Sequence, residues 1–345
     1  MKRPLLLPLV PLYAASLALR ELRLERGWEA IRRLRDPVIS IGNLSTGGSG
    51  KTPLATALAR LLTARGVHVD VLSRGYGRRS AVPLRVDPDG SADEYGDEPV
   101  LMARATGVPV YVAAERFDAG ELAEADAAND PAPRVHILDD GFQHRQLARD
   151  LDVLLLRESD LHDFLLPGGD LREPLKALNR ATVIAVQADE PEVERFLTER
   201  VAIDRNSEGA RRHGAVWRVR RRMEIPRVEG PVTAFCGIAR AEQFFAGLGA
   251  AGMTLASHHA FADHHRYTMS DVDRLVAKAR SSGSVALITT GKDEVRLGDL
   301  VSAFPPALPL KTAGLSVEIE DERAVLGWIE EKIAPRSTTA GNPRR

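Results

Sequence analysis

The stretch Asn43-Leu-Ser-Thr-Gly-Gly-Ser-Gly-Lys51-Thr52 decides the fold. It follows the apolar run Pro37-Val-Ile-Ser-Ile41 and precedes the helical pattern Pro53-Leu-Ala-Thr-Ala-Leu-Ala-Arg-Leu-Leu62, so it joins a strand to a helix. Glycines in such a loop let backbone N–H groups turn around a phosphate, and the start of the following helix adds partial positive charge. The sequence therefore predicts a phosphate-binding loop and a bound nucleoside triphosphate.

We expect the loop itself to hold the triphosphate. Lys51 should reach the β- and γ-phosphates, and the Thr52 hydroxyl should bind Mg²⁺. Ser45 stands where the usual pattern has its first glycine, but the flanking strand and helix favour a phosphate site over a flexible glycine turn. The expected phosphate-binding residues are Ser45, Thr46, Gly47, Gly48, Ser49, Gly50, Lys51 and Thr52.

Composition indicates an ordinary soluble enzyme. The 345 residues are 44 % hydrophobic and 28 % charged, which suits two packed α/β domains and excludes a disordered or fibrous chain. A net charge of −1 gives no global attraction to nucleic acid, so no nucleic-acid partner is expected. The single cysteine, Cys236, excludes an internal disulfide and is interpreted as a small buried hydrophobe.

The amino terminus departs from this pattern. Residues 4–19 form an apolar run that is shorter than the roughly twenty residues of a spanning helix and is interrupted by Pro8 and Pro11. Residues 20–35 carry six arginines and apolar side chains at helical spacing, which predicts an amphipathic helix on an anionic bilayer. A signal peptide, a spanning anchor and a helix packed on the protein's own core are the alternatives, and the membrane surface is favoured.

From residue 37 onward, short β-branched runs alternate with helical stretches, which predicts a mostly parallel sheet with helices on both faces. The segment after residue 190 is charged and loses strand character. Residues 215–220 alternate apolar and basic side chains before Pro226, Gly230 and Pro231, which predicts an exposed strand pair linking two lobes. The expected strands are 38–41, 67–72, 108–113, 135–138, 151–156, 182–186, 232–235, 254–256 and 285–289, with a helix at 270–280.

These patterns predict five parts of the chain. They are an N-terminal membrane-associated segment (1–36), a phosphate-loop core domain (37–213), a two-stranded linker (214–231), a smaller α/β lobe (232–335) and a disordered tail (336–345).

Two carboxylates end an expected strand in Val135-His-Ile-Leu-Asp139-Asp140-Gly141. In a phosphate-loop protein, the acid that holds Mg²⁺ lies at this carboxyl edge of the sheet. An Asp-Asp-Gly turn without metal is the alternative, and the loop at 45–52 favours the metal site.

Other polar residues follow strand ends, where α/β proteins place ligands. Arg74 lies between glycines in Ser73-Arg-Gly-Tyr-Gly-Arg78 and is a candidate for contacting a phosphate or sugar. Asp97 in Gly96-Asp-Glu-Pro99 is either the N-cap of a helix or the carboxylate that accepts the proton of an acceptor hydroxyl. The candidate substrate-binding residues are Arg74, Gln143, His144 and Arg172.

The segment 257–267 holds four histidines within eight residues. A structural zinc site is disfavoured here because Cys236 is distant and no tight Cys/His spacing occurs. We interpret Asp263 and His264 as an acid and an imidazole on a mobile loop.

Together these motifs resemble the tetraacyldisaccharide 4′-kinase family, the lipid A kinases of Gram-negative bacteria. The resemblance spans roughly residues 5–330 and rests on motifs that occur in one order. They are Gly-Asn-Leu-Ser-x-Gly-Gly-Ser-Gly-Lys-Thr-Pro, Ser-Arg-Gly-Tyr-Gly-Arg, Gly-Asp-Glu-Pro, Asp-Asp-Gly-Phe-Gln-His, Leu-Arg-Glu-Pro, Asp-His-His and Thr-Gly-Lys-Asp.

The resemblance implies an enzyme on the cytoplasmic face of the bacterial inner membrane, with two α/β/α lobes joined by a two-stranded linker. It would move the γ-phosphoryl group of ATP to the 4′-hydroxyl of a lipid-linked glucosamine disaccharide, with Mg²⁺ and no obligate protein partner. It also implies that Asp139 and Asp140 lie at the metal with Glu173 nearby. Asp97 would be the base and His264 would place or polarise it, and because they lie on different lobes we expect them to meet only when the cleft closes on substrate.

Two rival functions remain. A membrane-associated P-loop ATPase that switches partners would carry a signature lysine directly before the Gly-Gly pair, where this chain has Thr46. A soluble small-molecule kinase or GTPase would not need residues 4–35, and no Asn-Lys-x-Asp guanine motif is evident, which favours ATP.

Overall fold

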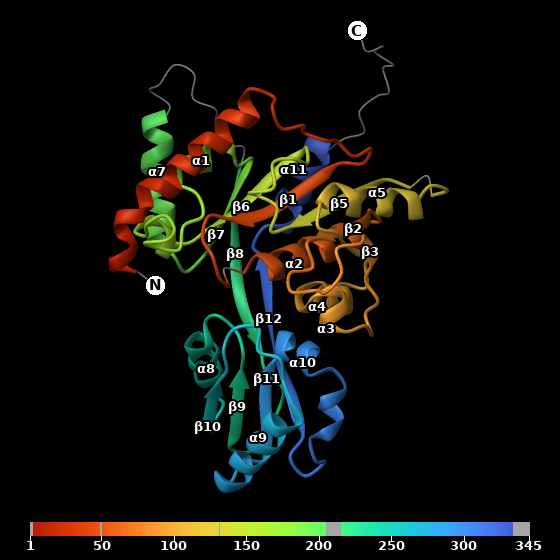
Figure 1. Ribbon diagram of the computed structural model, residues 1–345, viewed down its shortest axis with the longest axis vertical. Helices are drawn as coiled ribbons and strands as arrows, with labels where there is room; N and C mark the ends of the chain where they lie inside the picture. The colour runs from red at the N-terminus through yellow and green to blue at the C-terminus, as the bar shows by residue number, and fades with distance from the viewer. Residues whose placement is uncertain (1–2, 49, 131, 205–214, 334–345) are drawn as a thin grey trace.

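A computed structural model describes residues 3–48, 50–130, 132–204 and 215–333 (Figure 1). Their strands form one mixed, mostly parallel sheet in the order β10-β9-β11-β12-β8-β7-β6-β1-β5-β2-β4-β3. The strands are β1 (Val38–Asn43), β2 (His68–Ser73), β3 (Leu84–Arg85), β4 (Val110–Val112), β5 (Arg134–Asp139), β6 (Leu151–Leu156), β7 (Val183–Gln187), β8 (Ala215–Glu224), β9 (Val232–Cys236), β10 (Leu255–Ala260), β11 (Ala286–Thr290) and β12 (Leu310–Ile319).

Helices cover both faces of the larger lobe, as predicted (Figure 1). The α-helices are α1 (Val10–Glu25), α2 (Lys51–Thr63), α3 (Ala92–Tyr95), α4 (Asp97–Thr106), α5 (Arg116–Asp126), α6 (Glu158–Leu161), α7 (Pro191–Asp204), α8 (Ala241–Ala250), α9 (Met269–Ser281), α10 (Gly291–Leu297) and α11 (Glu322–Ile333). Shorter 3₁₀ helices are η1 (Pro4–Leu9), η2 (Leu175–Arg180) and η3 (Gly298–Ala303).

Successive side chains of a strand point to opposite faces of the sheet, and apolar side chains on both faces explain why helices cover both. Ile39 and Ile41 of β1 face a cluster that includes Leu54 and Leu58 of α2, four residues apart on one side of that helix. On the opposite face, Leu154 and its neighbours on β6 and β7 pack against α7 and η2. All these strand residues are fully buried, so the sheet is the core of the larger lobe.

Each strand expected from the sequence has a counterpart in the structure, and the predicted fold class is confirmed. The predicted strand pair differs in one respect. Segment 214–231 supplies only β8, whose antiparallel partner is β12, with Val219 opposite Ile319 and Glu224 opposite Gly314. Pro226 and Pro231 lack the backbone N–H that a ladder needs, whereas β12 contains no proline. The two long strands run from the larger lobe into the smaller one (Figure 1).

The amino-terminal helix is shorter than predicted. It ends at Glu25 and not near Arg35, because Gly27 adopts a φ of 67° and the backbone N–H of Trp28 donates to the carbonyl of Arg23 at 2.9 Å. This is the glycine-dependent bonding that closes many helices. The chain then runs irregularly to β1. The predicted disordered tail at 336–345 lies outside the described residues.

Candidate active site

The phosphate loop joins β1 to α2, as the sequence predicted. Gly47 and Gly50 adopt φ values of 85° and 99°, a region in which side-chain-bearing residues are strained. Ser45 forms a β-bridge with Leu171, so the unusual first residue of the loop is held by a neighbouring segment. Ser49 lies outside the described residues.

Lys51 begins α2 and points at oxygen acceptors on both sides of the loop. Its Nζ donates to Asn43 Oδ1 at 2.8 Å and lies 3.0 Å from Asp140 Oδ1. Burial lowers the pKa of Lys51, and the charge of Asp140 opposes that shift. The ammonium therefore already sits where it can exchange a carboxylate for a phosphate oxygen.

Asp140 lies just after β5 at a φ of 49° and receives two cations. Arg172 binds it through both terminal nitrogens, at 3.0 and 2.8 Å. Burial alone would raise the pKa of Asp140, but Lys51 and Arg172 hold it well below its usual range. Arg172, predicted to bind substrate, thus contacts the acid pair.

Asp139 is the last residue of β5 and is 2 % exposed. Burial, followed by the charges of Glu98 and Asp140, raises its pKa to about 7. Its Oδ1 atom has no hydrogen-bond partner among the residues described, which is costly for a buried carboxylate. Two carboxylates beside the hydroxyl-bearing first turn of α2 form an all-oxygen donor set that fits Mg²⁺.

Glu173 is buried, but its carboxylate pairs with Arg180 at 2.7 Å. After burial, the largest effect on the pKa of Asp139 comes from Glu98, a residue that sequence reasoning did not select. Glu98 is in turn ion-paired with Lys292 of α10, so a residue of the smaller lobe lies near the acid pair.

Asp97 lies in the first turn of α4 and is 4 % exposed. The helix cap is Gly96, and the Asp97 side chain is directed at the smaller lobe, which corrects the N-cap interpretation. Its Oδ2 accepts from Arg296 Nε at 2.7 Å and lies 3.4 Å from His264 Nδ1. The pair expected to meet only on closure is therefore in contact in this structure.

The environment of Asp97 keeps it ionised. Burial would raise its pKa, but His264, Arg296 and Lys292 hold it well below the usual range. The same interaction raises the pKa of His264, against the effect of burial. Asp263 is more distant, with its Oδ1 atom 3.9 Å from His264 Nε2.

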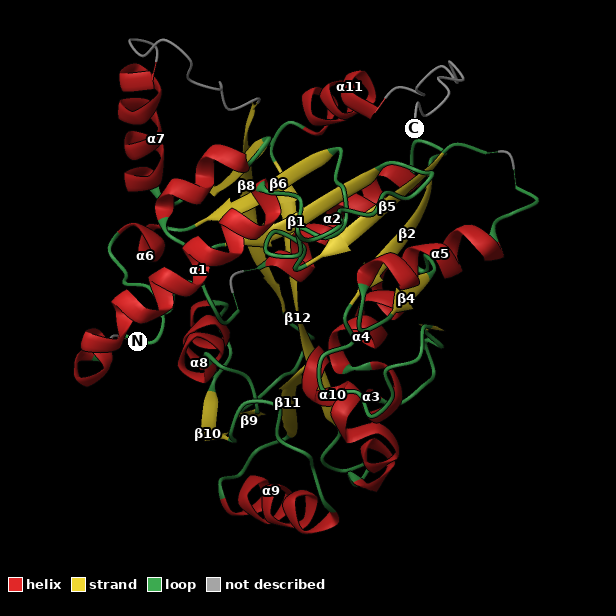
Figure 2. Cartoon of the chain, turned by 45° about the horizontal axis from the view of Figure 1, so that its top comes forward, coloured by secondary structure: helices red, strands yellow, loops and turns green. Residues whose placement is uncertain are grey.

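Helices α4 and α10 lie side by side at this junction (Figure 2). Lys292 and Arg296 are four residues apart on α10 and therefore share one face, which pairs with Glu98 and Asp97. Sequence reasoning noted the Thr-Gly-Lys-Asp motif as a polar loop but missed Arg296. Its helical spacing from Lys292 was the available signal.

The other predicted substrate residues surround the acid pair. Gln143 Nε2 donates to the carbonyl of Asn43 at 2.9 Å. Burial and then the charge of Arg116 lower the pKa of His144 to about 4. Arg116 was not predicted from the sequence. Burial has the largest effect on its pKa and lowers it, whereas the charge of Asp140 raises this pKa and that of Arg74 lowers it. Arg116, Asp140 and Arg74 are therefore close enough to interact electrostatically.

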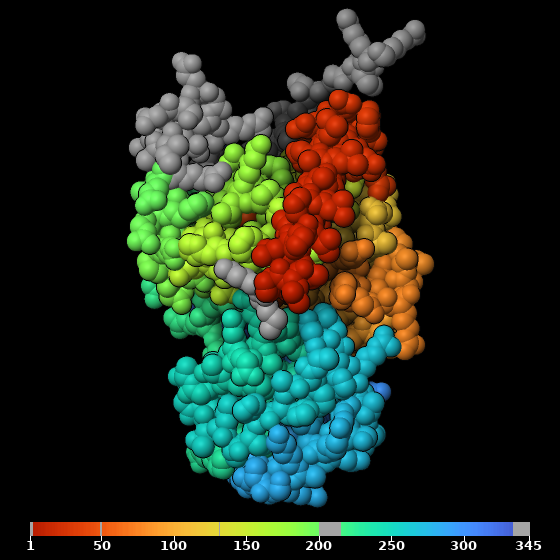
Figure 3. Space-filling model, turned by 60° about the vertical axis from the view of Figure 1, so that its left-hand side comes forward, coloured from red at the N-terminus to blue at the C-terminus, as the bar shows by residue number. Residues whose placement is uncertain are grey.

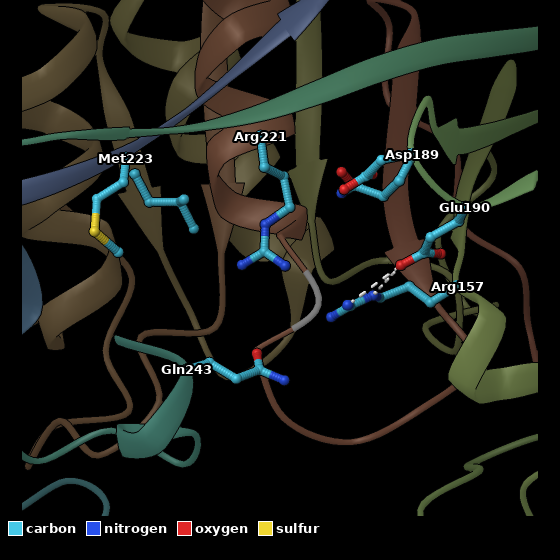
Figure 4. Close-up of a pocket in the computed structure, with 8 residues that line it drawn as sticks. Arg157, Asp189, Glu190, Arg221, Met223 and Gln243 are labelled. Carbon is cyan, nitrogen blue, oxygen red and sulfur yellow. Dashed lines mark hydrogen bonds and ion pairs between the residues drawn. The ribbon is translucent and has the colours of Figure 1, made fainter. Parts of the chain in front are cut away.

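A cavity of about 250 Å³ lies between the two lobes on the other side of the phosphate loop (Figure 4). Arg221 of β8 points into it, and a Cβ built on Gly50 would be 3.8 Å from its Nε atom. Gln187 lines the cavity, is 3 % exposed and has an Nε2 atom without a partner among the described residues. The cavity is thus lined mainly by polar side chains, one of which, Arg221, lies next to Gly50 of the loop.

The amino-terminal helix lies across the surface of the larger lobe (Figure 3). Tyr13 donates to the carbonyl of Arg172 at 3.0 Å, and Arg20 donates to the carbonyl of Gln143. Residues 4–25 are long and apolar enough to cross a bilayer, with a mean hydropathy of 1.5 in their most apolar window, and none of that window is buried. Both a spanning helix and a surface helix meet these criteria.

Comparison with known proteins agrees with this geometry. The chain is 41 % identical over 339 residues to the tetraacyldisaccharide 4′-kinase of Koribacter versatilis, covering 95 % of this chain and 99 % of the relative. It is 39 % identical to the enzyme of Geobacter metallireducens, covering 84 % and 87 %. The crystal structure of LpxK from Aquifex aeolicus in complex with ATP matches with a TM-score of 0.72 and 33 % identity, over 95 % of this chain and 98 % of that one. Residues 2–334 match the model of the tetraacyldisaccharide-1-P 4′-kinase family, and the chain belongs to that family.

Proposed function

We propose that this chain transfers the γ-phosphoryl group of ATP to the 4′-hydroxyl of a tetraacyl glucosamine disaccharide 1-phosphate in lipid A biosynthesis. One observation carries the proposal. The cluster of Lys51, Asp139 and Asp140 adjoins the pair of Asp97 and His264, because Glu98, the residue after Asp97, is close enough to Asp139 to raise its pKa. A phosphate site therefore lies next to a carboxylate that can orient an acceptor hydroxyl.

On the phosphate side, the loop residues bind the triphosphate and Lys51 leaves Asp140 for the β- and γ-oxygens. Thr52, Asp139 and Asp140 would hold Mg²⁺, with Glu173 as a further candidate. The ion would neutralise charge that develops on the phosphoryl oxygens. The polar cavity beside Arg221 and Gln187 is available to the nucleoside.

On the acceptor side, Asp97 accepts a hydrogen bond from the 4′-hydroxyl and then its proton. The low pKa of Asp97 makes it a weak base, but phosphoryl transfer has a loose transition state in which orientation matters more than base strength. Arg296 and His264 fix the carboxylate, and Asp263 flanks the imidazole. Arg74, Gln143, His144 and Arg172 are proposed to contact the lipid headgroup.

The amino-terminal segment fits a role at the cytoplasmic face of the inner membrane. One side of it bonds the active-site loops through Tyr13 and Arg20. The other side leaves Leu5, Leu12 and Leu19 exposed at 94 %, 73 % and 47 %. An apolar surface next to the proposed headgroup site would bring the 4′-hydroxyl of a membrane lipid within reach.

The test uses purified full-length protein, γ-labelled ATP, Mg²⁺ and the disaccharide lipid precursor in mixed micelles. We expect label in the lipid, with Asp97→Asn as the matched inactive control. Label that reached only free phosphate would instead indicate a partner-switching ATPase and reject the kinase proposal.

A further inference from the structure

A second polar cluster lies at the opposite end of β5 from the acid pair. His136 is the third residue of β5 and is fully buried. In the sheet register it lies between Val38 of β1 and Asp70 of β2. Glu124 of α5 and Asp36, which precedes β1, complete the cluster. None of these groups takes part in the proposed phosphoryl transfer.

The imidazole of His136 lacks hydrogen-bond partners within the described residues. Its Nε2 atom is 3.6 Å from Glu124 Oε1, and its Nδ1 atom is 3.5 Å from Asp70 Oδ2. Neither contact forms a well-aligned hydrogen bond, and both ring nitrogens are unsatisfied. A fully buried ring whose two nitrogens face carboxylates without a well-aligned hydrogen bond is a costly arrangement unless the ring is protonated or a ligand completes it.

The arrangement matches a metal site in two respects. One potential ligand atom each from Asp36, Glu124 and His136 lies within 4.8 Å of the others. Behind the ring, Asp70 faces Nδ1 and is itself held by Arg134 at 2.8 Å. A carboxylate on the far nitrogen is how metal-binding histidines are commonly oriented, with Nε2 left for the ion.

Charge and access favour a dication. Asp36 pairs with the exposed Arg35, and Glu124 Oε1 accepts the backbone N–H of Asp36 at 2.9 Å while lying 3.6 Å from His136 Nε2. The nearby Arg134 is held by Asp70, so the two carboxylates keep negative charge to offer an ion. The side chains of Asp36 and Glu124 are 20 % and 17 % exposed, which gives an ion a route from solvent to the buried ring.

We propose that Asp36, Glu124 and His136 bind a divalent transition-metal ion, with Zn²⁺ as the ion that one imidazole and two carboxylates suit best. Asp70 orients the imidazole. The ion ties the segment before β1 to α5 and β5. Since Asp36 ends the irregular stretch that follows α1, the site fixes the amino-terminal segment to the catalytic core.

The competing explanation is an ion pair with a protonated ring. Burial would lower the pKa of His136, but Asp70 and Glu124 raise it, so an imidazolium between two carboxylates is a self-consistent state. Substitutions of Glu124 distinguish the metal site from the imidazolium ion pair. Glu124→His keeps a metal ligand but removes the charge that an imidazolium needs, whereas Glu124→Gln removes both.

The experiment uses the full-length untagged protein, stripped with a chelator and dialysed against Zn²⁺, with metal content measured by mass spectrometry and Co²⁺ absorption as a second probe. We expect the parent protein and Glu124→His to retain one ion more per chain than Glu124→Gln and His136→Gln. Asp70→Asn should weaken Zn²⁺ binding about 10- to 100-fold. Glu192→Gln, which alters the exposed His162–Glu192 pair, is the matched control and should change nothing.

Equal metal content in the parent, Glu124→Gln and His136→Gln would overturn the proposal. So would a Glu124→His protein that loses both the ion and thermal stability as Glu124→Gln does, because that result supports the imidazolium ion pair. If His136→Gln does not fold, the two Glu124 variants decide the question by themselves.

Discussion

At the scale of single residues, the charged side chains of the candidate active site are paired with one another. A bound substrate must replace one partner of such a pair. Lys51 and Arg172 both neutralise Asp140, and Asn43 Oδ1 accepts from both cations. When a triphosphate takes Lys51, Arg172 remains on Asp140, so the acid is never left unpaired. This explains how a buried lysine can be available without destabilising the resting site.

Lys51→Ala should lower kcat by about 10²-fold or more, because the ammonium stabilises charge that is greatest in the transition state. The fold should persist because Arg172 still pairs with Asp140. The measurement is the rate of label transfer to lipid, alongside thermal unfolding. Lys278→Ala, on α9 and bonded to the carbonyl of His258, is the control. Near-native turnover by Lys51→Ala would reject the phosphate-loop assignment.

Arg296→Gln should change the pH dependence of kcat. Arg296 helps to keep the pKa of Asp97 below its usual range, and burial acts in the opposite direction. Without the guanidinium the pKa of Asp97 rises, so the carboxylate protonates at higher pH and the acid limb of the kcat profile moves to higher pH.

The control for this profile is Arg274→Gln. Arg274 pairs with Asp271 three residues earlier on α9, as Arg296 pairs with Asp293 on α10, but it lies on a different helix and its carboxylate partner is Asp271, not Asp97. A merely structural role for Arg296 would lower kcat equally at every pH and leave the limb in place.

At the scale of elements, short sequence patterns correctly predicted the features that depend on neighbouring residues in the chain. Apolar runs of β-branched residues predicted the strands, and the glycine-rich loop predicted the junction of β1 and α2. The end of α1 was missed although Gly27 marks it, because the charge pattern of residues 20–35 continues past the glycine. The pairing of β8 with β12 depends on residues about a hundred positions apart, and no local pattern encodes it.

The same distinction applies to the site. Lys51, Asp139 and Asp140 are adjacent to recognisable strand ends, and the structure brings them together. Arg296 contacts Asp97 across a sequence separation of 199 residues, so its role follows from the docking of α10 on α4. The ion pair of Glu98 with Lys292 likewise forms only because α10 docks on α4.

The amino-terminal helix gives a prediction at the element scale. Replacing the exposed Leu12 and Leu19 by Glu should weaken flotation with anionic vesicles, because each charge opposes burial in the acyl region. Turnover of a short-chain, micelle-free substrate should be kept, since Tyr13 and Arg20 still bond the active-site loops.

Met269→Glu at the start of α9 is the matched control, as its side chain is also exposed but lies in the smaller lobe. Unchanged flotation of the Leu12/Leu19 variant would show that this helix serves the protein's own core and not a membrane.

At the scale of the whole molecule, the two lobes are joined by the continuous ladder of β8 and β12 and by the docking of α10 on α4. The second contact brings Asp97 to Arg296, and His264 reaches Asp97 from the loop after β10, so the proposed acceptor site is assembled from both lobes. The proposed catalytic pair is therefore a contact between the two lobes as they stand in this structure.

A double-mutant cycle of Asp97→Asn and His264→Ala tests this assembly. If His264 works through Asp97, the double variant should turn over about as fast as the slower single variant, because residues that act as a unit are non-additive. ATP affinity, measured by nucleotide binding, should stay near the parent value in all three, since neither residue faces the phosphate loop. The 3.4 Å contact between Asp97 Oδ2 and His264 Nδ1 also predicts that the two substitutions are coupled in thermal stability. Rates that fall additively, with independent effects on stability, would mean that the contact between the lobes is structural and that Asp97 acts without His264.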